Sequence, residues 1–78
     1  MSENKVIAEI ENHSTELIKI QVNRWNGSAY IDVRIFYRKS PSDGEAWHPT
    51  KKGIRIHEEL LGDLISGLEK AQEAIEEG

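Results

Sequence analysis

Aromatic and basic residues alternate along the middle of the chain, and this combination of residue types is the strongest chemical signal in the sequence. Its members are Lys19, Trp25, Tyr30, Arg34, Phe36 and Arg38. Unpaired nucleobases stack on aromatic rings for about 1–3 kcal/mol each, while Lys and Arg contact the phosphates. The pattern therefore favours binding of a single nucleic-acid strand. The alternative is burial of the rings under a loop or between subunits, and the spacing alone does not distinguish the two.

A β-hairpin is predicted to carry these residues. Asn26-Gly27 separates two alternating runs, 17–25 and 28–38, and is the favoured dipeptide of a two-residue type I′ turn. Such a turn pairs position 25 with 28, 23 with 30 and 18 with 35. One face of the hairpin is then apolar, as expected of a half-buried antiparallel sheet. This face comprises Ile18, Ile20, Val22, Ile31, Val33 and Ile35.

Further elements are expected on both sides of the hairpin. Alternation over residues 6–10 predicts a first strand, after a disordered stretch over residues 1–5. Residues 39–50 are rich in Gly, Pro and Ser and predict a loop. A short strand over residues 54–56 is expected after Lys51-Lys52-Gly53.

An amphipathic helix is predicted from Glu58 to about Glu76, because apolar residues recur there at intervals of three and four. This apolar stripe is wider than a small sheet needs, so part of it is expected to face a second subunit. The predicted dimer contacts are Leu61, Leu64, Ile65, Leu68 and Ile75.

Charge is distributed unevenly along the chain. The net charge of −4, taken alone, argues against binding of nucleic acid. Residues 19–55, however, hold eight Lys or Arg against three acids, a net of +5, whereas residues 56–78 hold Lys70 against seven acids. Because the local field decides where a polyanion binds, the middle of the chain is the candidate binding region.

Composition excludes several classes of protein. The chain has no cysteine, which excludes disulfides and thiolate zinc sites. No apolar run reaches the roughly 20 residues of a membrane span or resembles a signal peptide. A length of 78 residues predicts one domain over 1–78. We expect a cytoplasmic or nucleoid-associated protein, nuclear if eukaryotic, without a membrane partner.

The sequence contains no group of residues typical of a catalytic site or a metal site. The three histidines are not grouped, and the helix that starts His57-Glu58-Glu59 has Leu61 where a metalloprotease requires its second histidine. Asp32 is interpreted as an ion-pair partner of Lys19 or Arg34 rather than as a general base. We expect no enzymatic activity, no cofactor and no metal.

Two motifs and the helix behind them occur together in one known family. The strand motif YIDVRIFY spans residues 30–37, and the strand start PTKKGI spans residues 49–54. With Gly44-Glu45 between them, residues 16–76 resemble the C-terminal domain of the transcriptional coactivator p15, or PC4, family, in a prokaryotic or phage-type member. The resemblance implies an α+β fold in which a curved four-stranded antiparallel sheet is followed by one C-terminal amphipathic helix, in a homodimer.

The resemblance also implies site residues. Trp25 stands at the family's aromatic position before the turn, Arg34 at its strand arginine and Tyr37 where tryptophan is common. Lys51 and Lys52 occupy its basic pair before the glycine. With the hairpin residues and a loop tryptophan, the predicted nucleic-acid-binding set is Lys19, Trp25, Tyr30, Arg34, Phe36, Tyr37, Arg38, Trp47, Lys51 and Lys52.

The ligand that the resemblance implies is single-stranded DNA, bound with little sequence preference, and RNA or unwound duplex stays open. The implied setting is transcriptional coactivation or regulation, or DNA replication and recombination, with the transcription or replication machinery as a candidate partner. The alternative function is a protein-interaction module that docks a polymerase or another partner without contacting nucleic acid.

Overall fold

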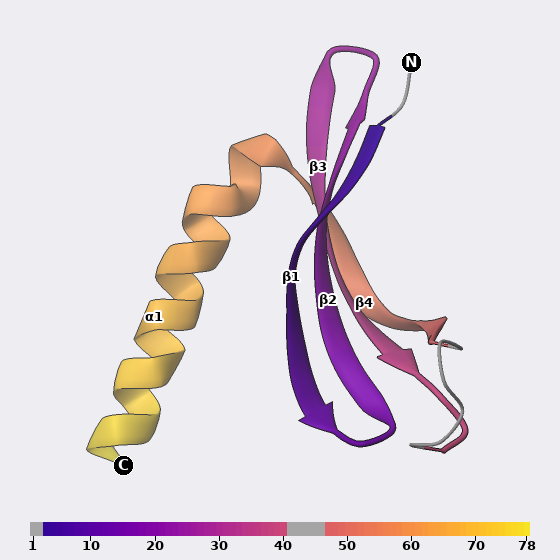
Figure 1. The fold of residues 1–78 in the computed structure, drawn as a ribbon. Helices are drawn as coiled ribbons and strands as arrows, with labels where there is room; N and C mark the ends of the chain where they lie inside the picture. Colours follow the sequence, from indigo (N-terminus) through magenta and orange to yellow (C-terminus); the bar gives the residue numbers. More distant parts are fainter. Residues whose placement is uncertain (1–2, 41–46) are drawn as a thin grey trace.

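Four antiparallel strands and a C-terminal helix make up the fold in the computed structural model, which describes residues 3–40 and 47–78 (Figure 1). The strands follow each other in space as in sequence, in the order β1-β2-β3-β4, and form one twisted, curved sheet. Their bounds are Glu3–His13 for β1, Glu16–Trp25 for β2, Ser28–Tyr37 for β3 and His48–His57 for β4. A 3-10 turn, η1 (Glu58–Leu60), leads into the helix α1 (Leu61–Glu77). The α+β class and the four-stranded sheet are as predicted.

The tight turn between β2 and β3 sets the register of the sheet. Asn26 and Gly27 both have positive φ angles, 55° and 83°, as a type I′ turn requires. Trp25 therefore pairs with Ser28, and the ladder continues without interruption to Glu16 opposite Tyr37. The predicted hairpin register is confirmed.

The last strand is longer than the sequence predicted. Residues 48–50 belong to β4 rather than to a loop, and the strand runs to His57 instead of covering only residues 54–56. Pro49 is tolerated because β4 is an edge strand, where a missing N–H need not face a neighbour. Thr50 bridges an irregularity in the ladder, since its hydroxyl donates to the carbonyl of Ile35 at 2.7 Å. Residues 41–46 of the predicted loop lie outside the described residues.

A glycine is required at position 53, where β4 passes close to the backbone of β3. A Cβ atom at Gly53 would lie 2.5 Å from the carbonyl oxygen of Val33 and 2.8 Å from the Cα of Arg34. Both atoms belong to the backbone, so no side chain can move aside. The glycine lets Arg34 and its neighbours sit directly against the edge strand.

The first strand is also longer than the predicted range of residues 6–10. Glu3 already pairs with Arg24, so residues 3–5 are part of β1, and the expected disorder of residues 1–5 is wrong for this part. Residues 1–2 lie outside the described residues. A bulge between Val6 and Ala8 keeps Ala8 and Ile10 in register with the apolar side chains of β2.

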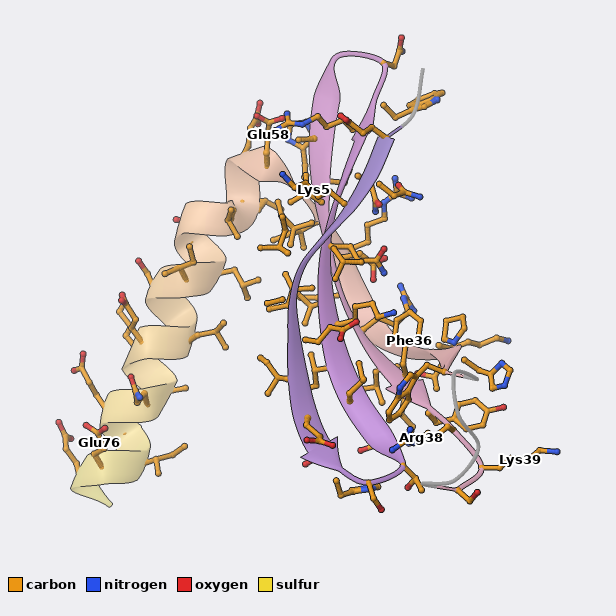
Figure 2. All side chains as sticks on the ribbon, in the orientation of Figure 1. Lys5, Phe36, Arg38, Lys39, Glu58 and Glu76 are labelled. Atoms are coloured by element: carbon orange, nitrogen blue, oxygen red, sulfur yellow. The ribbon has the colours of Figure 1, made fainter. Side chains whose placement is uncertain are left out.

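The helix leaves the end of β4 and lies on one side of the sheet, apart from the strands along most of its length (Figure 1). It faces the apolar side of the sheet, whereas Phe36 and Arg38 lie on the opposite side (Figure 2). None of the residues of α1 is buried, and Leu68 and Ile75 are 61% and 79% exposed. Within the described residues the buried apolar side chains are Leu17, Ala29, Ile31 and Phe36. A single chain therefore leaves much of its apolar surface in water.

One hydrogen bond ties the start of the helical segment to the hairpin. The Glu58 carboxylate accepts the backbone N–H of Ala29 at 2.7 Å. Ala29 lies one residue beyond the last pair of the β3–β4 ladder, Tyr30 with His57, so β4 offers this N–H no acceptor. Glu58 thus extends the ladder by one bond.

Replacing Glu58 by Ala is expected to lower the free energy of unfolding by on the order of 1 kcal/mol, because the N–H of the buried Ala29 loses its acceptor. Urea unfolding followed by circular dichroism measures the loss. Glu59→Ala is the matched control, since it removes the same charge from the same turn. Equal losses in the two variants would show that the Glu58 bond contributes nothing.

Candidate nucleic-acid interface

The polar face of the sheet brings the rings and cations together. Strand alternation places Lys19, Trp25, Tyr30, Arg34 and Phe36 on this face, and the β3–β4 register adds side chains from β4. We call it the ring face. It comprises Leu17, Lys19, Gln21, Asn23 and Trp25 of β2, Tyr30, Asp32, Arg34 and Phe36 of β3, and Gly53, Arg55 and His57 of β4.

At the hairpin end of the ring face, aromatic and basic side chains line an open hollow of about 560 Å³. We call it the hairpin-end hollow, and its lining residues are Trp25, Tyr30, Arg55 and His57. Trp25 is 57% exposed. The Arg55 guanidinium lies over the Tyr30 ring, 4.8 Å from its centroid, and the His57 ring meets the same tyrosine edge-on at 5.2 Å. An exposed ring and a guanidinium held over a second ring are groups that unpaired bases and phosphates bind.

The middle of the ring face is held by an internal ion pair. The Arg34 Nε and Nη2 atoms donate to the two Asp32 carboxylate oxygens at 3.0 and 3.2 Å, and Nη1 donates to the Thr50 carbonyl at 2.9 Å. Asp32 is therefore the ion-pair partner of Arg34, as interpreted from the sequence, although along one strand rather than across two. Because its donors have these partners, Arg34 joins β3 to β4.

Phe36 is buried beneath other side chains. Its ring is only 8% exposed, so the prediction that Phe36 presents a bare ring to solvent is wrong. Lys19 covers the ring with its Nζ 4.2 Å from the centroid, and the same Nζ lies 3.7 Å from the Glu9 carboxylate. Leu17 and Pro49 are its partners on the neighbouring strands. For this ring the alternative of burial holds, under side chains of the subunit itself.

Another pairing of ring and cation lies at the opposite end of β3. The Arg38 guanidinium is 4.5 Å from the centroid of the Trp47 ring, and its Nε donates to the Ser14 carbonyl at 2.8 Å. Tyr37 is exposed, and its ring contacts that of His48 at 5.4 Å. By alternation Tyr37 points away from the ring face, so the structure separates it from Phe36 and Arg38.

The two predicted lysines of β4 lie on the edge strand of the sheet. Lys51 and Lys52 are both exposed. Lys52 lines a hollow of about 310 Å³ on the apolar side of the sheet, together with Arg34, Gly53 and apolar side chains including Ile18 and Ile54. The structure thus brings Trp25 and Tyr30 together at one end of the ring face and Arg38 and Trp47 at the other, and places Lys52 at the far edge.

Sequence reasoning missed Arg55 and His57. The alternation of Gly53, Arg55 and His57 was visible, but the face they share depends on the register of β4 against β3. No short turn sets that register, because the connection between the two strands is long. Within residues 3–40 and 47–78, no group of three His, Cys, Asp or Glu side chains is arranged to hold a metal ion. No helix in the described ranges is long and apolar enough to cross a membrane.

Comparison with known proteins now decides the family. The family model described as Transcriptional Coactivator p15 (PC4) matches residues 12–67. The chain belongs to the PC4 family. Among solved structures, it is similar to BPSL1147, a PC4 homologue from Burkholderia pseudomallei. The orthorhombic crystal form has 36% identity and a TM-score of 0.76, with 90% of each chain covered. The tetragonal form has 35% identity and a TM-score of 0.75, covering 90% of this chain and 98% of the other.

A search of curated proteins gives no match. Membership of the PC4 family confirms the resemblance seen in the sequence, and the similarity to a bacterial homologue supports the prokaryotic type. PC4 proteins are DNA-binding proteins and not enzymes, so this chain has a PC4-like nucleic-acid-binding role. The comparisons assign no ligand to individual side chains.

Proposed function

We propose that the protein binds single-stranded DNA with little sequence preference through its ring face, as a homodimer. The observation that carries the proposal is Trp25, a large ring that is 57% exposed at the rim of a hollow shared with a stacked arginine. A water-facing sheet gains nothing from such a ring, whereas an unpaired base stacks on it. Stacking accepts every base, which accounts for weak sequence preference.

The charge distribution supports a single strand as the ligand. Arg55 is exposed on the ring face, and Arg38 lies just beyond the other end of this face, so cations flank the neutral Asp32–Arg34 pair. A strand laid across the face meets rings and cations at both ends. The acids of α1 lie on the opposite side of the sheet and leave this field in place.

We propose that a second copy of the chain packs against the exposed apolar surface of the helix and the sheet. The apolar stripe of α1 and the apolar side of the sheet are both incompletely buried in one chain, and contiguous exposed apolar surface marks an association site. The proposed contacts are Leu61, Leu64, Ile65, Leu68 and Ile75. The dimer would carry two ring faces.

Titration of the protein with oligo(dT), followed by the fluorescence of Trp25 and Trp47, tests this function. We expect quenching at low salt and weaker binding as salt rises, because phosphate contacts release counterions. An absence of quenching at low salt would overturn the proposal. Docking of a protein partner would then be favoured, and binding that survives nuclease treatment would identify it. Parallel titration with oligo(U) decides between DNA and RNA.

The proposed setting is transcription or DNA replication and recombination, wherever strands are exposed, in the cytoplasm or at the nucleoid. Family membership supports the link to transcription. Binding with little sequence preference suits any process that exposes single strands.

A further inference from the structure

We propose that the hairpin-end hollow is a subsite for one nucleotide of the bound strand, in which the base stacks on the exposed tryptophan and the phosphate contacts Arg55 and His57. This inference rests on the proposed function. It goes further because neither the sequence motifs nor the comparisons assign a role to Arg55 or His57.

The lining of the hollow comes from three neighbouring strands. Trp25 ends β2, Tyr30 lies near the start of β3, and the two other residues lie near the end of β4. The hollow, of about 560 Å³, is open to solvent, so a base can enter it without displacing a side chain. Its walls are aromatic with a few polar groups, as is usual for ligand sites. The hollow therefore suits one flat base and its phosphate.

Arg55 is held in place by a ring contact rather than by an ion pair. Its guanidinium carbon lies over the Tyr30 ring, 4.8 Å from the centroid, and this cation–π contact holds the charge at the hollow. Within the described part of the chain, no carboxylate lies at ion-pairing distance from Arg55. Asp32, its neighbour across the ladder, is already paired with Arg34. Arg55 is thus a pre-positioned cation at this end of the ring face.

His57 adds a hydrogen-bond donor with an assigned tautomer. Its Nδ1 accepts the backbone N–H of Glu59 at 3.2 Å and so caps η1. We assign the proton of the neutral ring to Nε2 because Nδ1 serves as an acceptor. The ring also packs edge-on against Tyr30, at an interplanar angle of 85°. The cap and the ring contact hold the imidazole at the hollow, where Nε2–H can donate to a phosphate oxygen.

Arg55→Gln tests the phosphate contact directly. We expect binding of oligo(dT) about tenfold weaker at low salt. The slope of log K against log salt should fall in magnitude by about 0.7 per occupied subsite, the value for one phosphate contact on a single strand. Arg24→Gln is the matched control, because Arg24 lies at the same end of the sheet on the apolar side, beside Val22. If both variants lost the same affinity for oligo(dT), the loss would come from the lower net charge alone, and the proposed subsite would be wrong.

A double-mutant cycle between Trp25→Ala and Arg55→Gln tests whether one nucleotide contacts both residues. If base and phosphate belong to the same nucleotide, losing either contact weakens the other, and the two losses should depart from additivity by at least about twofold. Additive losses would place the two residues on different nucleotides and overturn the inference. If the wild type binds oligo(dT) and the losses in the two variants are additive, the subsite is refuted but the proposed function stands. If the wild type does not bind oligo(dT), the proposed function itself is refuted.

Discussion

Leu68→Asp is expected to turn the protein into a monomer. Leu68 is 61% exposed in the single chain, at the centre of the apolar stripe of α1, and in the proposed dimer it is covered by the second copy. Burying an unpaired carboxylate costs several kcal/mol. Because about 1.4 kcal/mol corresponds to a factor of ten, the dissociation constant of the dimer should rise at least about a hundredfold. Light scattering at micromolar concentration measures the mass.

Ser66→Asp is the control for this variant, because it adds the same charge at a different face of the helix. Helical geometry places Ser66 on the side of α1 opposite Leu68. It should keep the mass of the dimer. Circular dichroism shows whether the Leu68→Asp monomer stays folded, and we expect lower thermal stability because few side chains are buried within one chain. A dimer mass for Leu68→Asp, or a monomer mass for the wild type, would contradict the proposed interface.

Elements with a local cause were predictable from the sequence. Asn26-Gly27 determines a type I′ turn by its own backbone preferences, and the register of ten residue pairs follows from it. The helix was likewise predicted from its period, and only its first turn differs, since Glu58–Leu60 is a 3-10 turn capped by His57. These features depend on neighbours in the chain.

Features that depend on distant segments were not predictable in the same way. Alternation assigns Phe36 to the ring face, but the side chains that cover it come from other strands, with Lys19 from β2 and Pro49 from β4. The extent of β4 depends on its place at the sheet edge and on the Thr50 bond to Ile35. Both facts become visible only when the strands are assembled.

The candidate site shows the same division. Trp25 was identified because the turn next to it is a local signal, and it is exposed as expected. Arg34 was identified by its motif, yet Asp32 and Thr50 occupy its donors. Arg55 was missed because its neighbour Tyr30 is 25 positions away in sequence and meets it only through the β3–β4 register. The aromatic and basic side chains at the hairpin end are therefore brought together by tertiary structure, not by their spacing in the sequence.

Trp25→Ala is expected to weaken binding of oligo(dT) by about 5- to 150-fold, which corresponds to the roughly 1–3 kcal/mol of one stacked base. Trp25 is 57% exposed, and the type I′ turn next to it does not depend on which side chain stands at position 25. The free energy of unfolding should therefore change little. The tryptophan carries no charge, so the salt dependence of binding should keep its slope while the affinity falls at every salt concentration. Fluorescence anisotropy of a labelled oligonucleotide measures both quantities.

Trp25→Phe separates stacking from other causes of that loss. A phenyl ring keeps a stacking surface at the rim of the hairpin-end hollow, so we expect this variant to recover most of the affinity that Trp25→Ala loses. If the tryptophan acted only by shaping the hairpin, both variants would shift thermal unfolding together with affinity. If Trp25→Ala bound oligo(dT) as tightly as the wild type, the strand would have to follow a path that avoids the hairpin end, and the ring face would lose the observation on which its function rests.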